Sequence, residues 1–321
     1  MSQKVDVIIP MYNRANYVLD IISELEKQTL KEFRAIFVDD GSTDNTYEVL
    51  TNKLANASFE YTVIKKENGG AGSARNAGLR AAEADWVAFV DSDDGLSPDF
   101  LEYLYTSAIN TDSDLAICNL KMYPPGEKAV DEPAQNLEYE LISSAKAMKI
   151  FCTKWLGPVC FLINKKIILS DSLFFDEECI YNEDASYLPT VIAAADKVAY
   201  IEQELYFYYT HPGSLHRSPS LDKFYSAIKS FSNTEEKLLN RNNDAAETFN
   251  NMGSARFYIA TLRRAAVQLP YSDFKTLEKE INFKRFKKQI KNLLPSQKIA
   301  CYIFLVSKLL FYCGMKLMFK D

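Results

Sequence analysis

Short apolar runs alternate with segments of helical periodicity along the first hundred residues. The runs are VDVIIP (5–10), FRAIFVDD (33–40), YTVIKKE (61–67) and DWVAFVD (85–91), and the segments between them space apolar residues three and four positions apart. Strands that alternate with helices predict an α/β fold in which a mostly parallel central sheet is flanked by helices. Ligands of such sheets bind beyond the carboxyl ends of the strands.

Polar or acidic clusters follow all four runs. They are PMYN (10–13), DDGSTD (39–44), ENGGAGSARN (67–76) and DSDDG (91–95). Because parallel strands end at the same edge of a sheet, we expect these four loops to converge there.

The rest of the chain follows a different pattern. Between residues 100 and 215 the sequence predicts strands over 114–123 and 158–168, helices over 143–152 and 183–196, and a pair of strands within 197–210. After Ser218 it reads as helices, among them 221–239 and 254–269. We therefore divide the chain into an α/β domain, 1–217, and a helical C-terminal region, 218–321.

Charge is distributed unevenly. Residues 284–321 carry nine basic residues and one acidic residue, so the net charge of −6 leaves 28 basic and 42 acidic residues in the rest of the chain. An acidic body argues against nucleic-acid binding. Six well-separated cysteines without a CxxC pair, and an N-terminus that does not resemble a secretory signal, predict a cytoplasmic protein.

The basic end, residues 296–320, has two interpretations. Lys308 and Lys316 interrupt its apolar run, which disfavours a membrane-spanning helix. On a helix, Lys298, Lys308, Lys316 and Lys320 share a sector of about 120°. Residues 296–320 are therefore either an amphipathic helix on the inner face of an anionic membrane, or a core-packing helix with solvated lysines.

The DSDDG cluster suits a hard cation. Mg²⁺ and Mn²⁺ prefer oxygen ligands and are commonly held by one or two carboxylates and the phosphates of a substrate. Asp91 and Asp93, with Ser92 between them, fit this chemistry. The alternative is a capping cluster, in which Ser97 caps a helix that begins at Pro98.

Two neighbouring clusters suit a nucleotide. Asp39 and Asp40 can accept the N–H of a base or a sugar hydroxyl, while Thr43 or Asp44 can cap the next helix. Gly70 allows close backbone approach, and Arg75 can contact a phosphate or pair with an acid of the body. GxGxxG, phosphate-loop and GxSxG motifs are absent, and His211 and His216 are the only histidines.

In this combination the chain resembles family 2 glycosyltransferases, which have the nucleotide-diphospho-sugar transferase fold called GT-A. The resemblance rests on five motifs in the family's order, over about residues 4 to 216. They are VIIPMYNRANYVLDIISELEKQTL, VDDGSTDNT, NGGAGSARNAGL, FVDSDDGLSPDFL and YNEDASYLP. Such a set is specific for the family and says little about which sugar is transferred.

The resemblance implies roles for the donor-binding residues. Pro10 and Tyr12 would line the nucleotide pocket, with Asp40 on the base, expected to be uracil, and Asp39 nearby. Arg75 would face the diphosphate, with Gly70 and Ser92 in the same donor-binding set.

The remaining implied roles concern the metal, the base and a closing loop. Asp91 and Asp93 correspond to the family's DxD motif, with Asp93 on a Mn²⁺ or Mg²⁺ ion, Asp91 toward the ribose or sugar, and Asp94 behind them. Asp184 matches the catalytic base of inverting members. The segment THPGSLHRS resembles the loop that closes over the diphosphate, with His211 and either Ser214 or Arg217 in contact.

The implied reaction moves a sugar from a UDP-linked donor to a saccharide or lipid-linked acceptor, in bacterial surface polysaccharide or glycoconjugate synthesis. The family's QxxRW motif is absent, which favours transfer of a single sugar. Burial beside Glu183 is expected to raise the pKa of Asp184. The alternatives are that residues 182–184 only begin a helix, and that the chain is an inactive, nucleotide-binding scaffold at the membrane. The oligomeric state stays open.

Overall fold

The computed structural model describes residues 3–129, 136–210 and 220–318. Within these residues a nine-stranded sheet has the order β3-β2-β1-β4-β8-β6-β9-β5, with β7 paired to β9. The strands are β1 (Val5–Met11), β2 (Phe33–Asp40), β3 (Glu60–Lys66), β4 (Trp86–Phe89), β5 (Gly95–Leu96), β6 (Leu115–Tyr123), β7 (Glu140–Ser143), β8 (Phe161–Asn164) and β9 (Lys197–Tyr209).

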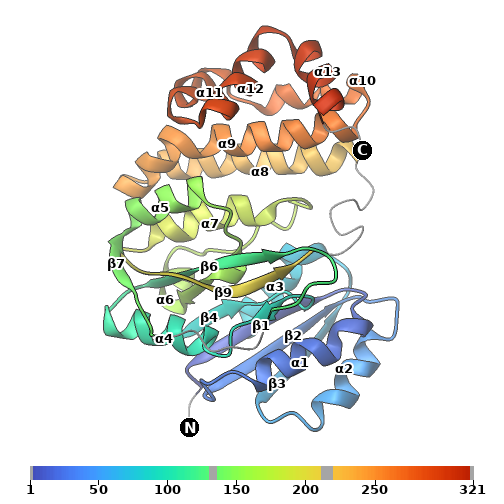
Figure 1. Ribbon diagram of the computed structural model, residues 1–321, viewed down its shortest axis with the longest axis vertical. Coiled ribbons are helices and arrows are strands. Elements are labelled where there is room, and N and C mark those ends of the chain that lie inside the picture. The colour runs from blue at the N-terminus through green and yellow to red at the C-terminus, as the bar shows by residue number, and fades with distance from the viewer. Residues whose placement is uncertain (1–2, 130–135, 211–219, 319–321) are drawn as a thin grey trace.

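Helices cover the sheet and form the upper tiers of the molecule in Figure 1. They are α1 (Val18–Glu26), α2 (Thr46–Leu54), α3 (Gly70–Ala81), α4 (Phe100–Asn110), α5 (Ser144–Thr153), α6 (Lys165–Ser170), α7 (Glu183–Ala194), α8 (Leu221–Leu239), α9 (Asp244–Gln268), α10 (Tyr271–Phe274), α11 (Phe283–Gln289), α12 (Pro295–Val306) and α13 (Lys308–Met318). The predicted α/β class with a mostly parallel sheet and C-terminal helices is confirmed.

The first four strands form the parallel half of the sheet. β1 pairs in parallel with β2 and with β4, and β2 pairs in parallel with β3. All residues of β1 except Pro10 are buried, as expected for a central strand covered on both faces. Helix α3 packs directly against β1 at Gly78. A Cβ atom added at this glycine would stand only 2.4 Å from Cγ2 of Ile8, so only glycine permits so close an approach.

Two local predictions in the second half are wrong, and so is the alternative that Ser97 caps a helix. The strand expected over 158–168 is only β8, since a 3-10 turn precedes it and α6 follows it. The strand pair expected within 197–210 is the single strand β9, because no glycine or proline interrupts this stretch and β6 pairs along much of it. Ser97 does not cap α4, which begins at Phe100; its carbonyl instead accepts a hydrogen bond from Gln28 Nε2 (3.0 Å).

Helices α8 and α9 join the sheet domain to the C-terminal tier. Phe249 and Leu238 are buried in the core around the sheet, while Phe231 and Tyr258 are buried in a second core with α10 to α13. The predicted division at residues 217 and 218 falls outside the described residues.

The tail is two helices rather than the single helix predicted over 296–320. The chain is extended at Ser307 (φ −155°, ψ 111°), where α12 ends and α13 follows. One side of each helix is buried in the second core, through residues such as Phe304 and Phe311. The other side is apolar and exposed: Val306 is 82% and Leu317 73% exposed.

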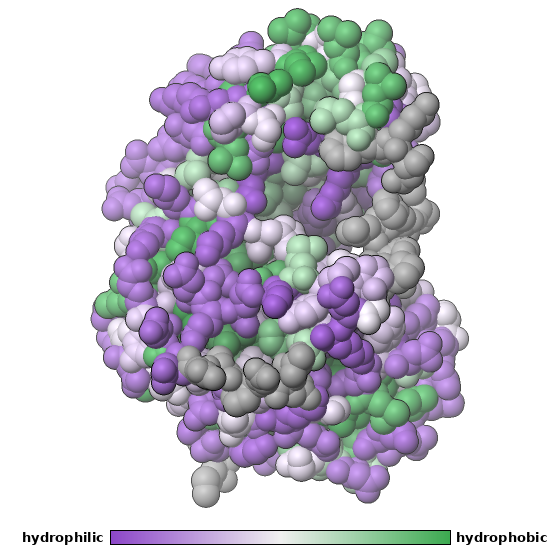
Figure 2. All heavy atoms as spheres, in the orientation of Figure 1, coloured by the Kyte–Doolittle hydropathy of each residue, from purple (hydrophilic) through white to green (hydrophobic). Residues whose placement is uncertain are grey.

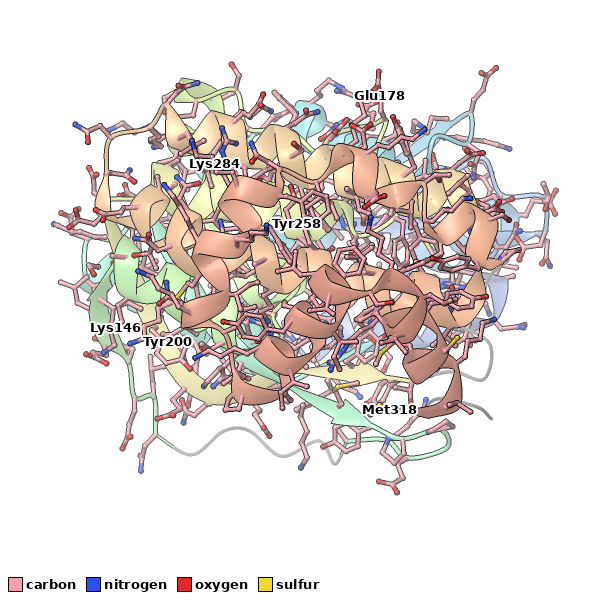
Figure 3. All side chains as sticks on the ribbon, turned by 90° about the horizontal axis from the view of Figure 1, so that it is seen from above. Lys146, Glu178, Tyr200, Tyr258, Lys284 and Met318 are labelled. Carbon is pink, nitrogen blue, oxygen red and sulfur yellow. The ribbon has the colours of Figure 1, made fainter. Side chains whose placement is uncertain are left out.

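This exposed apolar surface is seen at the top of Figure 2, over the C-terminal helices. In the view from above, Lys284 and Met318 lie at opposite edges of this tier (Figure 3). No helix within the described ranges is long and apolar enough to span a bilayer. Lys320, which belonged to the predicted basic face, lies outside those ranges.

Candidate active site

A cavity of about 370 Å³ opens at the carboxyl edge of β1, β2 and β4. Eight residues predicted from the sequence line it together: Pro10, Tyr12, Asp40, Gly70, Arg75, Asp91, Ser92 and Asp93. Met11, Arg14, Asn68, Ala71 and Ala74 complete the lining. The four polar loops therefore converge as expected from parallel strands that end at one edge.

Asn13 connects the first two of these loops. Its backbone lies in the left-handed region (φ 53°), which asparagine tolerates better than most residues. Its Oδ1 accepts the N–H of Thr43 (2.8 Å), and its own N–H donates to Ser42 Oγ (3.0 Å). This pairing fixes PMYN against DDGSTD at the rim of the cavity.

Asp40 holds the glycine-rich loop in place. Its Oδ1 accepts hydrogen bonds from Lys66 Nζ (2.7 Å) and from the N–H of Gly69 (3.0 Å), and its Oδ2 accepts from the N–H of Gly70 (2.7 Å). The carboxylate that was expected to contact a base is thus already engaged by three donors.

Asp39 is fully buried beside Met11, its partner in the β1–β2 register. Its Oδ1 accepts from the N–H of Ser42 (3.2 Å), while Oδ2 is buried and has no hydrogen-bond partner among the described residues. An unpartnered buried carboxylate oxygen is costly, so a ligand donor there would be stabilising.

Arg75 is the buried cation of the site. Its Nη2 donates to Asp91 (2.9 Å), its Nη1 donates to Glu183 (2.6 Å), and the guanidinium lies 5.5 Å from the ring centre of Phe175. Burial opposes the charged form, but the charges of Asp91 and Glu183 outweigh it and raise the pKa of Arg75 above its usual value. Arg75 therefore joins the DSDDG loop to the start of α7.

Asp93 is paired with a different arginine. Its Oδ2 lies 2.9 Å from Nη2 of Arg14, in the segment that follows β1. Asp91 and Asp93 are both partly exposed to the cavity, with side chains 33% and 18% exposed. Each carboxylate of the predicted DxD motif thus has a guanidinium as its counter-ion.

Asp94 is buried behind these two carboxylates. Its Oδ2 accepts from the Tyr206 hydroxyl (2.7 Å), and its Oδ1 accepts from the N–H of Tyr209 (3.0 Å). Burial and then the charges of Asp91 and Asp93 raise the pKa of Asp94 well above its usual value. Asp94 connects the loop to β9 and does not line the cavity of about 370 Å³.

Asp184 stands in the first turn of α7, next to the residue that binds Arg75. Asn182 precedes this turn in a left-handed conformation (φ 55°) and forms no side-chain cap. Burial and then the charge of Glu183 raise the pKa of Asp184 to about 6, although Arg75 lowers it. The charge of Asp91 also raises this pKa, by a smaller amount.

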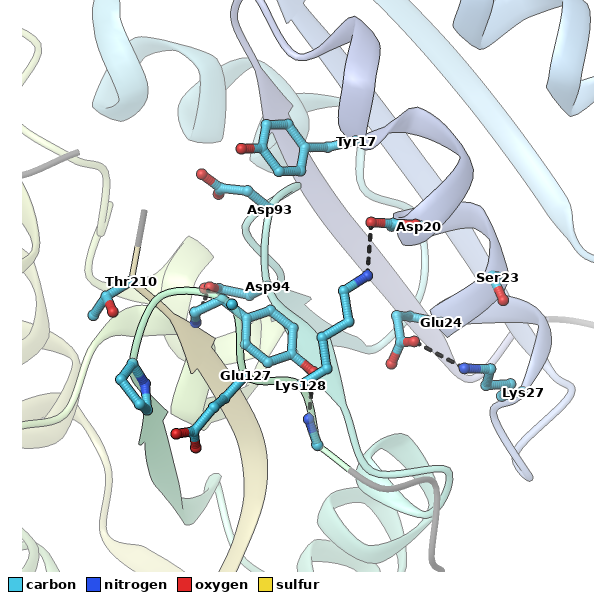
Figure 4. Close-up of a pocket in the computed structure, with 14 residues that line it drawn as sticks. Tyr17, Asp20, Ser23, Glu24, Lys27, Asp93, Asp94, Glu127, Lys128 and Thr210 are labelled. Carbon is cyan, nitrogen blue, oxygen red and sulfur yellow. Dashed lines mark hydrogen bonds and ion pairs between the residues drawn. The ribbon is translucent and has the colours of Figure 1, made fainter. Parts of the chain in front are cut away.

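A second cavity of about 400 Å³ adjoins the first and shares Asp93 with it (Figure 4). It lies between α1 and residues 124–129, and the ion pair of Lys128 with Asp20 (3.1 Å) crosses it. Asp184 is not among the residues that line this cavity or the first one.

Some site predictions have a different outcome. His211, Ser214 and Arg217 lie outside the described residues. Arg14 was not predicted, because nothing in the local sequence shows that it meets Asp93. The motif PMYN did mark the neighbouring segment as part of the site, and it is the signal that could have directed attention to Arg14.

Comparisons with known proteins identify the relatives of the chain. Residues 6–168 match the family described as Glycosyl transferase family 2. Glycosyltransferase GlyG of Streptococcus pneumoniae serotype 4 is 28% identical over 231 residues, which cover 68% of this chain and 74% of that protein. Poly(ribitol-phosphate) beta-N-acetylglucosaminyltransferase TarS of Staphylococcus aureus is 26% identical over 234 residues, which cover 70% of this chain and 39% of that protein.

Two solved structures share the fold. S. aureus TarS 1–349 in complex with UDP-GlcNAc has a TM-score of 0.74 at 19% identity, covering 99% of this chain and 92% of that chain. Mannosyltransferase PcManGT of Pyrobaculum calidifontis, in complex with GDP-Man and Mn²⁺, has a TM-score of 0.54 at 14% identity, covering 96% of this chain and 88% of that chain. The chain belongs to glycosyltransferase family 2 and is a transferase enzyme with the GT-A fold.

Proposed function

We propose that this chain transfers a single sugar from a UDP-linked donor to a saccharide or lipid-linked saccharide acceptor, with inversion at the anomeric carbon. The observation that carries the proposal is the cavity at the carboxyl edge, in which Arg75, Asp91 and Asp93 lie together. The likeness to TarS, which is solved with UDP-GlcNAc and with UDP, supports a uridine donor.

The base of the donor would be recognised by Asp39 rather than Asp40. The three donors on Asp40 leave it little capacity, whereas Asp39 Oδ2 is a buried acceptor that has no partner among the described residues. Uracil carries one ring N–H, which a carboxylate oxygen can accept. Asp40 then acts by shaping the loop of Gly69 and Gly70 that approaches the nucleotide.

A divalent cation fits this site only together with the donor. Among residues 3–129, 136–210 and 220–318, no group of three His, Cys, Asp or Glu side chains is placed to hold a metal ion. Asp91 and Asp93 supply carboxylate oxygens, and the diphosphate would supply the others, as hard cations commonly require. Mn²⁺ or Mg²⁺ bound there would neutralise charge on the departing nucleoside diphosphate.

The chain's own residues would carry the remaining steps. Arg75, fixed by Asp91 and Glu183, presents a permanent positive charge toward the leaving group. Asp184, with a pKa of about 6, is ionised at neutral pH and takes the proton of the acceptor hydroxyl as that oxygen attacks.

The acceptor would be reached at the inner face of the plasma membrane. The surface of α12 and α13 exposes the apolar residues Ile299, Tyr302, Ile303, Val306, Leu309, Leu310, Leu317 and Met318. Exposed lysines on α11 and in the segment after it, such as Lys284 and Lys291, are available for anionic headgroups. This arrangement supports a role in surface polysaccharide or glycoconjugate synthesis, with residues 1–217 handling the donor and 218–321 the membrane.

Thermal unfolding with UDP, GDP, CDP, ADP and TDP, each with and without Mn²⁺, tests the proposal on wild type and Asp93→Ala. We expect stabilisation by UDP with Mn²⁺, and loss of the Mn²⁺-dependent part in Asp93→Ala. Stabilisation by another nucleotide would reassign the donor. Donor binding without turnover on any acceptor would point to the scaffold alternative instead.

A further inference from the structure

The two arginines that face the DxD carboxylates are held very differently. Arg75 is 6% exposed and paired with both Asp91 and Glu183, so moving it would break two ion pairs of a buried cation. Arg14 is 24% exposed, and among the described ion pairs it contacts Asp93 alone. Arg75 is therefore a fixed part of the site, whereas Arg14 can leave Asp93 at much lower cost.

Arg14 occupies the carboxylate that a metal would need. Its Nη2 lies 2.9 Å from Asp93 Oδ2, a charge-assisted contact at hydrogen-bond distance. A guanidinium stays protonated at every accessible pH, so it cannot yield to a metal by losing its proton. A cation on Asp93 and a guanidinium at the same carboxylate would repel each other, so a bound metal weakens the contact with Arg14.

A second anion within reach would receive the displaced side chain. Arg14 lines the same cavity as Arg75, Gly70 and Asp91, where the diphosphate of a donor is expected. Its guanidinium lies 5.6 Å from the ring centre of Tyr17, and its backbone N–H donates to Thr46 Oγ1 (2.7 Å). The backbone is thus anchored by Thr46, while the partly exposed guanidinium lines the cavity beside Asp93.

We propose that Arg14 is the internal counter-ion of Asp93, which a divalent cation must displace, and that the displaced guanidinium then pairs with the donor diphosphate. This rests on the proposed donor and metal. It makes metal binding weak without nucleotide and strong with it, because the nucleotide compensates the arginine that the metal has displaced. Arg14 is then a positioning residue that couples the two ligands.

Mn²⁺ binding, measured by electron paramagnetic resonance of the free ion with and without UDP, tests this on wild type and Arg14→Gln. We expect Arg14→Gln to bind Mn²⁺ alone about tenfold more tightly, and to lose about tenfold of the tightening that UDP causes in wild type. Arg14→Lys retains the charge and should still bind Mn²⁺ alone weakly. Lys128→Gln removes the same charge from the neighbouring cavity, and its Mn²⁺ affinity should equal that of wild type.

The results separate the counter-ion role of Arg14 from the assignment of the metal and of the nucleotide. If wild type binds Mn²⁺ and Arg14→Gln binds it no more tightly, the counter-ion role is wrong while the metal assignment stands. The same tightening in Lys128→Gln would reduce the effect to net charge and also overturn it. If wild type binds UDP but never Mn²⁺, the metal assignment fails together with this inference, and the nucleotide assignment remains.

Discussion

The charge on Asp184 should cost the folded protein stability at neutral pH. Its pKa rises from the ordinary value of 3.8 to about 6 because of burial and the neighbouring Glu183. This difference between the two pKa values corresponds to at most about 3 kcal/mol, and local relaxation reduces the cost to about 1–3 kcal/mol. Because the folded pKa is raised, the cost is absent below about pH 4 and complete above about pH 7.

Asp184→Asn removes the charge and keeps an oxygen that can accept the N–H of Ala185, now 2.9 Å from Oδ1. We expect its free energy of unfolding, measured by urea denaturation, to exceed that of wild type by about 1–3 kcal/mol at pH 7.5 and to match it at pH 4. Transfer should fall by about 100-fold or more while UDP binding persists. Wild-type transfer should rise with pH through about 6, as the base ionises.

Asp20→Asn is the matched control, because Asp20 is an exposed carboxylate paired only at the surface with Lys128. Its effect should stay below about 1 kcal/mol and show no comparable increase with pH. The reasoning fails if Asp184→Asn is less stable than wild type at pH 7.5, or if the difference between them is the same at both pH values. Asp184 would then be a stabilising ion of the first turn of α7.

Two further predictions concern packing and the tail. Gly78→Ala should lower the free energy of unfolding, measured in urea, by about 1–3 kcal/mol, because its Cβ would stand 2.4 Å from Ile8 Cγ2. Its control is Gly314→Ala, in open space on α13, which should be neutral or stabilising by up to about 1 kcal/mol. If both variants lost the same stability, the close approach of α3 to β1 would be contradicted. The double variant Val306→Glu with Leu317→Glu should bind vesicles containing anionic phosphatidylglycerol about tenfold more weakly or worse, by cosedimentation. Leu169→Glu, at an exposed leucine on α6, is its control, and unchanged binding of the double variant would exclude the tail as a membrane contact.

The parallel half of the fold was predictable because its signal is local. β1 is buried on both faces and reads as a continuous apolar run, and the polar loops after β1, β2 and β4 meet because parallel strands end at one edge. The second half was less predictable. Whether 197–210 folds as one strand or two depends on β6, which pairs along β9 but is distant in sequence.

The C-terminal tail was also only partly predictable from the sequence. Its periodicity predicted one amphipathic helix, yet the chain is extended at Ser307, and α12 and α13 each bury one side in the core around Phe304 and Phe311. A helical projection assumes one continuous straight helix, so it could not show that the chain breaks at Ser307.

The sequence by itself determined the kind of chemistry, since residue types and their order at the strand ends place carboxylates, glycines and one arginine at a shared edge. Only the tertiary structure decided which partner each of them has. Asp40 is engaged by the glycine-rich loop, Asp39 Oδ2 has no partner in the described part of the chain, and Arg14 faces Asp93 from a distant segment. Spacing along a chain fixes which side chains reach the edge, whereas hydrogen bonds and ion pairs there depend on distances between segments that local sequence does not encode.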